Sequence, residues 1–590
     1  MANSNKNLSQ FNRKFLNSDN RITFIGSGSI GGKATSLATM NAILSEEFNF
    51  TDFPTIEINI PTLTVIRTDV FDKFLTSNHL HEIALSDKSD ERISHAFQKA
   101  DLPFEILGDL RALVNEVHSP LAVRSSSLLE DALYEPFAGI YGTKMTPNNQ
   151  HDSDTRFRKL VEAIKFVFAS TFFRTAKDYF KATKHRIEDE KMAVIIQEVV
   201  GHRFNDRYYP HISGVARSYN FYPMSRAAPE DGVVNLALGL GKTIVDGGIS
   251  WVYSPAYPNI NPPYSTIGEM LKQTQTEFWS INMGKAPAYD PINETEYMRS
   301  ENITAAEKDG TLRYIASTVD NSSGRLTMGT GVAGPRVLTF APTLQLDDIP
   351  LNKLLKSLLS LCEKEINAPV EIEFAMTLKS AGSVTHKHRF GFLQVRPMVV
   401  STEKVDLNPS ELTQNGILAA SVNTLGNGFI ESITDVIYVI PDKFEAKHTP
   451  QIAAELEAIN KTVVSENRKY LLIGFGRWGS SDPWLGIPVN WAQISGAQII
   501  VEATLENMNV ELSQGSHFFH NLTSFGVAYF SVPFTSPYKI DWNWLEEQKI
   551  QDETTFVRHI VLPSPLSIKI DGRNGRGIII KPKRVKYAEQ

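Results

Sequence analysis

The first 400 residues alternate between short apolar runs and longer segments in which apolar residues recur every three or four positions. Short runs bounded by turn residues predict β-strands, and the wider spacing predicts amphipathic helices. This alternation is typical of an α/β fold. The expected strands are residues 21–25, 55–60, 192–200, 233–238, 369–375 and 389–396, and the expected helices are residues 34–44, 157–179 and 351–363, with residues 61–75 as a strand passing into a helix.

A polar stretch at residues 401–414, with the turn-forming pair Asn408-Pro409, interrupts this pattern. Strands and a helix alternate again beyond it, which predicts a separate α/β domain at residues 415–590. The first domain is then expected at residues 21–400, after an N-terminal arm at 1–20 and before a linker at 401–414. The strands expected in the last part are residues 436–440, 469–473, 497–503, 525–532, 566–570 and 577–581, and the helix is residues 450–463.

The composition narrows the class of protein. The chain has 590 residues, of which 42% are apolar and 21% are charged, as in an ordinary globular protein of several domains. Its net charge of −7 argues against an extended nucleic-acid surface, which needs a basic excess, but leaves room for a local anion pocket. The single cysteine, Cys362, rules out an intrachain disulfide and a metal–thiolate cluster.

The N-terminus is polar and lacks the apolar segment of a signal peptide. No uninterrupted run of about 18 apolar residues occurs anywhere in the chain. We therefore expect no membrane span, no membrane partner and a cytoplasmic location.

A glycine-rich turn at residues 26–33 lies between the first expected strand and the first expected helix. Its glycine spacing fits the dinucleotide fingerprint, but the acidic residue expected about 20 positions later at a strand end is missing. A P-loop would need Gly at position 27 and Ser or Thr at position 34, where the chain has Ser27 and Ala34. What remains is Lys33 near a helix N-terminus, which suits an anion. A plain strand–helix turn is the alternative.

Residues 123–131 place an arginine, Arg124, before three hydroxyl side chains and an acidic pair. A guanidinium group offers a fork of N–H donors and serines offer short hydroxyl donors, and both suit phosphate. Taken alone, a solvated loop explains this segment as well.

Two carboxylates, Glu371 and Glu373, share one face of an expected strand, because side chains alternate along a strand. Gln394 and Arg396 show the same alternation on the next expected strand. If the two strands pair, acids and arginine line one cleft. Mg²⁺ favours a few carboxylates together with phosphate oxygens, so the pattern suits a Mg²⁺–polyphosphate site; a solvated strand face is the alternative.

These motifs together resemble the nucleotide-binding domain of the pyruvate phosphate dikinase and phosphoenolpyruvate synthase family. The same domain occurs in rifampin phosphotransferases and glucan water dikinases. Each motif is weak alone, but so many motifs in the family's order are highly specific. The segments that carry the resemblance are residues 31–37, 61–74, 123–131, 137–143, 192–197, 213–216, 239–241, 372–374 and 394–397.

The resemblance implies an ATP-grasp-like fold that clamps ATP between subdomains, with Mg²⁺ as cofactor. It implies that Lys33 and Arg124 hold phosphates and act in catalysis, and that Gln197 lines the adenine pocket. Glu373 matches the main metal-binding acid, with Glu371 supporting it. The other implied ATP-site residues are Gly139 and Thr143, in the loop that closes over the phosphates, and Gln394 and Arg396.

The chain also departs from the family pattern. Lys242 follows Gly-Leu-Gly where the family usually has Glu, and Glu371 stands where the family usually has Asp. The phosphohistidine signature of full dikinases is missing, and the nearest stretch is residues 514–520 with His517. The length leaves no room for a phosphoenolpyruvate barrel. We therefore expect ATP binding with an unknown phosphoryl acceptor, for which a separate histidine carrier and His517 are both candidates.

The C-terminal domain has its own dense segment at residues 474–484, a Gly-rich loop with Arg477, Trp478 and Trp484. It follows a strand, and α/β domains bind ligands at the carboxyl ends of strands, so we predict an acceptor or effector site here. A structural loop packed by its tryptophans is the alternative. Three functions stay open: an ATP-dependent phosphotransferase, a non-catalytic ATP-sensing module coupled to the C-terminal domain and, on the glycine turn alone, a nicotinamide-dependent oxidoreductase.

Overall fold

A computed structural model gives the fold of the chain. It describes residues 9–13, 21–130, 139–181, 183, 185–221, 223, 226–246, 248–259, 266–272, 274–346, 349–379, 387–400, 405–480, 484–506, 508, 522 and 526–582.

The chain divides into two compact units. The first comprises Met1–Phe180, His185–Tyr219 and Glu230–Met398, and the second comprises Lys181–Lys184, Asn220–Pro229 and Val399–Gln590. Two short segments from the first 230 residues thus group with the second unit, which the hydrophobic pattern did not indicate. The domain limits given by the sequence stay predictions.

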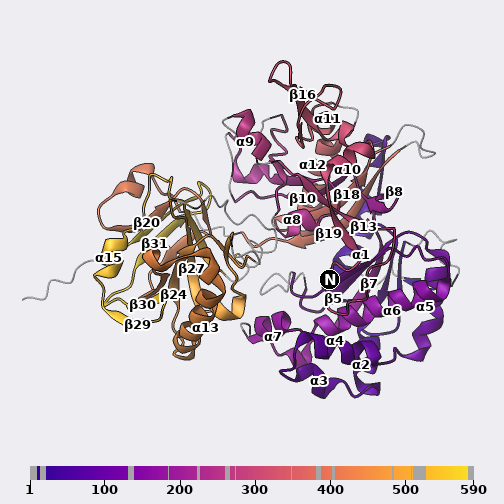
Figure 1. Cartoon of the computed structure of the whole chain (residues 1–590), viewed down its shortest axis with the longest axis horizontal. Coiled ribbons are helices and arrows are strands. Elements are labelled where there is room, and N and C mark those ends of the chain that lie inside the picture. The colour runs from indigo at the N-terminus through magenta and orange to yellow at the C-terminus, as the bar shows by residue number, and fades with distance from the viewer. Residues whose placement is uncertain are drawn as a thin grey trace, which may run out of the picture. The chain divides into compact units, whose positions relative to one another are not determined.

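The first sheet of unit 1 is built around β7, which is antiparallel to both β4 and β5. On one side of this sheet Figure 1 shows the helices α2 (Thr68–Ser77), α4 (Asp90–Lys99), α5 (Phe104–Glu116) and α6 (Ser153–Ser170). The helix α6 packs on β5 and β6, and α4 and α5 pack on α6. In sheet order the strands are β1 (Ser9–Gln10), β2 (Ile22–Ile25), β4 (Leu63–Ile66), β7 (Met192–Glu198), β5 (Leu121–Ser127) and β6 (Thr143–Thr146).

One helix expectation is wrong. Residues 157–179 do not form one long helix, because α6 ends at Ser170 and α7 (Arg174–Lys181) follows it. The ring of Phe172 lies between them and packs against Phe71 and Phe97, with centroids 6.1 and 5.9 Å away. Asp90 then accepts the backbone N–H of Arg174 at 2.8 Å, which stabilises the start of the second helix. Tertiary packing therefore breaks a segment whose spacing is helical throughout.

The second sheet of unit 1 joins strands that lie far apart in the sequence. Its strand β18 is antiparallel to both β10 and β19, and β3 pairs with β19 in parallel. The helix α12 (Leu351–Ile366) packs on β18 and β10, whereas α1 (Gly31–Glu47) contacts both β19 and β5. One apolar core thus connects the two sheets. In sheet order the strands are β12 (Trp251–Tyr253), β11 (Val233–Ala237), β10 (Ile212–Arg217), β18 (Val370–Thr377), β19 (His388–Pro397) and β3 (Ile56–Asn59).

Smaller elements complete unit 1. One sheet has the order β14 (Met298–Asn302), β13 (Glu277–Asn282), β9 (Arg207–Tyr209) and β8 (His202–Phe204), and another has the order β16 (Leu326–Met328), β15 (Ser317–Val319) and β17 (Arg336–Val337). The short helices are α3 (His81–Leu85), α8 (Lys242–Val245), α9 (Ile267–Lys272), α10 (Ile303–Lys308) and α11 (Ala341–Gln345).

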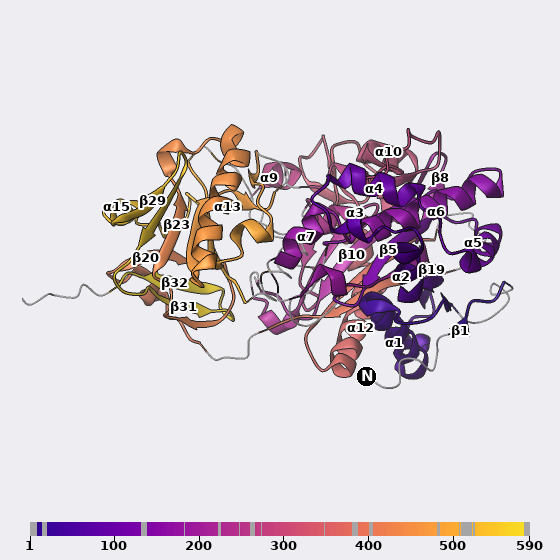
Figure 2. The ribbon, with the colours of Figure 1, turned by 90° about the horizontal axis from the view of Figure 1, so that it is seen from below.

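Unit 2 contains a seven-stranded sheet whose centre is parallel. Its helix α13 (Thr449–Ser465) contacts β26 and β30 and is seen beside β23 in Figure 2. The sheet order is β21 (Thr424–Leu425), β28 (Ala528–Val532), β27 (Ala497–Ala503), β24 (Tyr470–Phe475), β23 (Asp435–Val439), β30 (Val557–Val561) and β29 (Ile550–Glu553). The other elements are β20 (Ile417–Ser421), β32 (Arg576–Ile580), β31 (Ser567–Asp571) and β22 (Gly428–Ile430) in one sheet, β25 (Arg477–Trp478) and β26 (Gly486–Ile487) in another, and the short helix α15 (Trp542–Glu546).

Part of the expected linker is folded. The short helix Pro409–Thr413 begins with a capping box formed by Asn408 and Glu411. Leu407 and Leu412 are buried against Ala420 and Ile578, so this stretch packs on the second unit.

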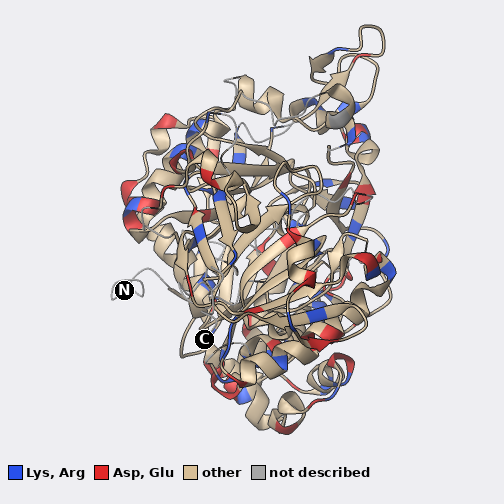
Figure 3. Cartoon of the chain, turned by 90° about the vertical axis from the view of Figure 1, so that its left-hand side faces the viewer, with Lys and Arg blue, Asp and Glu red and all other residues tan. Residues whose placement is uncertain are grey.

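No helix in the described part of the chain has the length and apolarity needed to cross a bilayer. In the view of Figure 3, Lys and Arg (blue) and Asp and Glu (red) are both spread over the ribbon.

Candidate functional site

Arg124 connects the two large sheets of unit 1. It lies on β5, where its guanidinium donates to the side-chain oxygen of Gln197 on β7 at 3.3 Å. From the other sheet, the backbone oxygen of Leu393 accepts at 3.0 Å and the side-chain oxygen of Gln394 at 2.9 Å. The Arg124 side chain is 13% exposed, so these charge-assisted bonds form with little competition from water.

Glu373 lies next to this arginine. It is the cross-strand neighbour of Gln394 in the β18–β19 pair, and its Oε2 is 3.6 Å from Nη2 of Arg124. That separation is an ion pair without a hydrogen bond, and the carboxylate keeps 16% of its surface exposed. The structure therefore brings Arg124, Gln197, Glu373 and Gln394 together, and β18 and β19 pair as the strand-pairing hypothesis supposed.

Glu371 and Arg396 form a second group two cross-strand pairs further along, beyond Ile372 and Val395. Oε1 of Glu371 accepts from Nε of Arg396 at 2.8 Å, and Oε2 accepts from Nε of Arg217 at 2.6 Å. Arg217, on β10, is a charged residue of this site that the sequence analysis missed. The signal available was weak, since Arg217 directly follows the family-like segment 213–216.

Lys33 is held by an acid that the sequence analysis saw but gave no role. Its Nζ is 2.7 Å from Oε1 of Glu130 and 3.4 Å from Oγ of Ser125. Glu130 also accepts the Ser125 hydroxyl and the backbone N–H of Ser127, both at 2.8 Å. Glu130 is buried, so this network holds the Lys33 ammonium group beside Ser125 on β5, the strand that also carries Arg124.

The glycine-rich turn is explained largely by packing. A Cβ atom on Gly31 would lie 1.7 Å from the backbone oxygen of Ser126, so only glycine lets the turn approach β5 so closely. Backbone N–H groups of the turn already have side-chain acceptors: Ser27 donates to Asp69 at 2.7 Å and Ser29 to Thr68 at 3.0 Å. The plain-turn alternative therefore accounts for the glycines, and Lys33 is the part of the turn suited to an anion.

The expected closing loop is described in part. Residues 131–138 lie outside the described residues, so nothing is said of their structure. Gly139 adopts a left-handed φ of 70°, and Thr143 pairs directly with Arg124 across β6 and β5. Lys242, where the family usually has Glu, forms an ion pair of 2.8 Å with Asp246 in the next turn of its helix.

The carboxylates fit Mg²⁺ unequally. Both oxygens of Glu371 accept hydrogen bonds from guanidinium groups, so coordination there would have to displace an arginine. Glu373 is partly exposed and makes one longer ion pair, so its carboxylate suits a metal that takes its other ligands from phosphate and water. Among the described residues, no group of three or more His, Cys, Asp and Glu side chains is arranged to hold a metal by itself.

A protein-family match includes all the strands that carry the Arg124 cluster. A family model described as "Pyruvate phosphate dikinase, AMP/ATP-binding domain" matches residues 27–416. The chain belongs to this family. The resemblance drawn from the motifs is thereby confirmed, and so is the α/β class with an ATP-grasp-like domain for AMP/ATP binding. The match ends at residue 416, so most of unit 2 lies beyond the family domain.

One curated relative is the "Uncharacterized phosphotransferase YvkC" of Bacillus subtilis (strain 168). It is 25% identical over 237 residues, which are 40% of this chain and 25% of the relative. The aligned part thus spans about a quarter of the relative's length.

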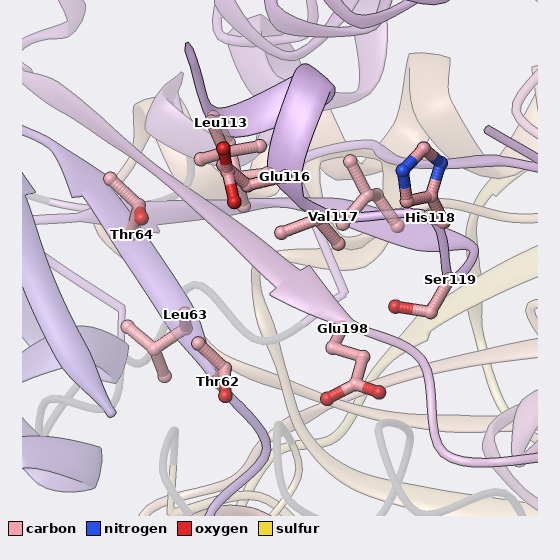
Figure 4. Close-up of a pocket in the computed structure, with 11 residues that line it drawn as sticks. Thr62, Leu63, Thr64, Leu113, Glu116, Val117, His118, Ser119 and Glu198 are labelled. Atoms are coloured by element: carbon pink, nitrogen blue, oxygen red, sulfur yellow. The ribbon is translucent and has the colours of Figure 1, made fainter. Parts of the chain in front are cut away.

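A cavity in unit 1 is lined by other residues than the cluster of Arg124, Gln197, Glu373 and Gln394. It measures about 180 Å³ and lies where α5 ends beside β4, β5 and β7, with Glu116, His118 and Glu198 among its lining residues (Figure 4). Ligand pockets for drug-sized molecules usually exceed about 300 Å³, so this cavity is too small for a nucleotide. Its β7 residues, Ile196 and Glu198, alternate with Gln197, which bonds Arg124.

The Gly- and Trp-rich segment of unit 2 separates into packing and surface residues. Trp478 is 2% exposed, and its backbone N–H and indole N–H donate to Glu502 at 3.0 Å and to the backbone oxygen of Val501 at 3.3 Å. Its ring covers Gly474. Trp484 is 75% exposed, and Arg477 is partly buried. Packing therefore explains Trp478, whereas Arg477 and Trp484 stay candidates; His517 lies outside the described residues.

Proposed function

We propose that this chain is a Mg²⁺-dependent, ATP-consuming phosphotransferase of the dikinase type. The observation that carries the proposal is the convergence around Arg124, which draws Gln197, Gln394 and Glu373 from three strands of two sheets. A hydrogen-bonded arginine beside a partly exposed carboxylate suits a metal–polyphosphate ligand.

In this proposal each candidate residue has a stated task. Lys33 and Arg124 hold phosphates and stabilise the charge that develops during phosphoryl transfer. Gln197 lines the adenine pocket, and its buried Nε2, which has no hydrogen-bond partner among the described residues, is a donor that a bound ligand would satisfy. The remaining contacts are Gly139 and Thr143 in the closing loop, and Gln394 and Arg396 on β19.

Glu373 is proposed as the metal ligand, and Glu371 supports it from the neighbouring position on β18. Bound Mg²⁺ would neutralise phosphate charge and hold the phosphates in a defined geometry. The reaction's acceptor is proposed to be a substrate of the C-terminal unit or a separate histidine carrier protein. We propose the cytoplasm as the location.

The alternative is a non-catalytic ATP-sensing module. Lys242 favours it, because a cation paired with Asp246 now occupies a position where the family usually places an acid. Such a change alters the charge near the proposed phosphate site without removing the Arg124 network.

The decisive experiment incubates the purified chain with Mg²⁺ and ATP carrying label in the β- or the γ-phosphate. A dikinase-type reaction splits ATP into AMP, one released phosphate and one phosphoryl group that is transferred to an acceptor. Mass spectrometry identifies any residue of the chain that is phosphorylated and which phosphate it received. Binding of ATP without AMP formation would support the sensing module instead. An absence of ATP binding would refute both proposals.

A further inference from the structure

Three charged side chains lie abreast in the second sheet of unit 1. Arg217 on β10, Glu371 on β18 and Arg396 on β19 are direct cross-strand neighbours, since Glu371 pairs with both arginines. Residues opposite each other on adjacent strands point to the same face of a sheet. The row therefore presents two guanidinium groups with one carboxylate between them.

All three side chains are well shielded from water. The exposed fractions are 11% for Arg217, 3% for Glu371 and 1% for Arg396. Buried charges are costly unless they are paired. The three side chains of the row sum to one positive charge, which favours an anion over a cation beside them.

Arg217 also retains a donor for such an anion. Its Nε bonds Glu371 and its Nη1 bonds the side-chain oxygen of Asn235 at 3.3 Å. Across the described ranges, its Nη2 donates no hydrogen bond and no second carboxylate lies within ion-pair distance. Both oxygens of Glu371 accept hydrogen bonds from arginine, so this carboxylate orients the two guanidinium groups.

The row is adjacent to the proposed nucleotide site. Glu371 and Glu373 are two residues apart on β18 and face the same way, which separates them by about 7 Å along the strand. Arg124 and Gln394 flank Glu373. An anion bound to the row would therefore lie next to the groups proposed to hold ATP.

We propose that Arg217 is a phosphate-binding residue of the nucleotide site, contacting the β- or γ-phosphate of a nucleoside triphosphate, and that Glu371 is a positioning residue for Arg217 and Arg396. The inference rests on the proposed nucleotide site. It adds a residue from β10 and specifies how Glu371 supports the site, by orienting two arginines rather than by coordinating metal directly.

Calorimetric titration of the full chain with ATP, ADP and AMP in the presence of Mg²⁺ tests the role of Arg217. Arg217→Gln removes the charge, and a charged hydrogen bond of this kind changes affinity by at least about tenfold. We expect the dissociation constant for ATP to rise at least about tenfold and that for AMP to change less than about twofold. Arg207→Gln is the matched control. Arg207 lies on β9, in another sheet, is 15% exposed and pairs with Asp309 at 2.9 Å.

A second pair of variants tests the role of Glu371. If Glu371 acts through the arginines, Glu371→Gln weakens ATP binding by a similar factor with Mg²⁺ and with a chelator. Under the same conditions Glu373→Gln weakens it only with Mg²⁺. A Glu371→Gln defect confined to Mg²⁺ would make Glu371 a metal ligand and overturn this part of the inference.

The outcomes separate the inference from the function on which it rests. Failure of the wild-type chain to bind ATP refutes the proposed function. Tight ATP binding by Arg217→Gln, or an equal loss for ATP and AMP, refutes the inference alone. If Arg217→Gln does not fold, as judged by thermal unfolding beside Arg207→Gln, Arg217→Lys replaces it. Lysine keeps the positive charge but cannot form the same hydrogen bonds as a guanidinium group. The inference requires this variant to weaken ATP binding more than AMP binding.

Discussion

The guanidinium of Arg124 donates a hydrogen bond of 2.9 Å to the side-chain oxygen of Gln394, although 270 residues separate the two in sequence. Arg124 belongs to the first sheet of unit 1 and Gln394 to the second. The bond therefore ties together two sheets whose strands are interleaved along the chain. It also places the arginine beside Glu373, within reach of the carboxylate proposed to bind metal.

Replacing Arg124 by Ala is expected to weaken ATP binding by about 2–5 kcal/mol, because the change removes a charged donor from a desolvated phosphate site. Calorimetry on both proteins measures the effect. Arg389→Ala is the control, since Arg389 lies on β19 and, like Arg124, bonds across to β7, where Glu198 accepts at 3.0 Å outside the Arg124 network. Equal ATP affinity in wild type and Arg124→Ala would remove Arg124 from the site.

Glu373→Gln is expected to reduce Mg²⁺-dependent turnover of ATP more than it reduces nucleotide binding without metal. The amide keeps the size of the side chain but loses the negative charge that attracts Mg²⁺. Turnover and metal-free binding are measured on the same preparations. Glu198→Gln is the control carboxylate, because it pairs with Arg389 outside the proposed site. A parallel loss of both quantities, or no loss, means that Glu373 does not coordinate metal.

Trp478→Ala is expected to destabilise unit 2 by about 3–5 kcal/mol, because it leaves a cavity where a large buried ring packed. The same change also removes the indole N–H that donates to Val501. Chemical denaturation monitored by circular dichroism reports the loss. Trp484→Ala, on a ring that is 75% exposed, is the matched control and should change the unfolding free energy by less than about 0.5 kcal/mol. Similar costs for both variants would contradict the packing role of Trp478.

Arg477→Ala is expected to abolish ATP consumption, or the response to nucleotide, while leaving ATP affinity intact. The reason is that Arg477 follows β24 at the carboxyl end of parallel strands, where α/β domains place ligands. Assays of AMP formation and calorimetric binding separate the two effects. His517→Ala should change neither. The reverse pattern would transfer the acceptor role to His517, and no effect from either variant would show that unit 2 acts elsewhere.

His211 is expected to make the stability of unit 1 depend on pH. Burial, together with the nearby charges of His202, Arg313 and His388, lowers the pKa of His211 from 6.5 to about 3. Above pH 6.5 the ring is neutral in both the folded and unfolded chain. As pH falls below that value only the unfolded chain takes up the proton, so folding loses stability, by about 1.4 kcal/mol at pH 5.5.

Urea denaturation at pH 7.5 and pH 5.5 checks this sign. The variant His211→Gln should lose less stability between the two pH values than wild type does, while its amide oxygen still offers an acceptor to the backbone N–H of Leu378. If the two proteins lose stability equally, His211 is not the group that titrates on unfolding.

Local sequence pattern determined most of the elements. The alternation in residues 369–375 and 389–396 predicted two strands, and the structure has β18 and β19 there with Glu373 opposite Gln394. The helix expected at residues 351–363 is α12. These predictions hold because side-chain periodicity in a strand or helix depends on neighbours a few residues away. The order of the family motifs likewise identified the AMP/ATP-binding domain without any structure.

Tertiary structure alone decided which charged groups meet. Arg217 pairs with Glu371, 154 residues away, and Lys33 with Glu130, 97 residues away. Local residue spacing cannot predict pairs at such separations. Packing of Phe172 against Phe71 and Phe97 ended a helix that periodicity would have continued. Packing likewise assigned Trp478 to the core of unit 2. Strand register and side-chain packing act between distant segments, and these distant contacts determined how each charge in the candidate site is held.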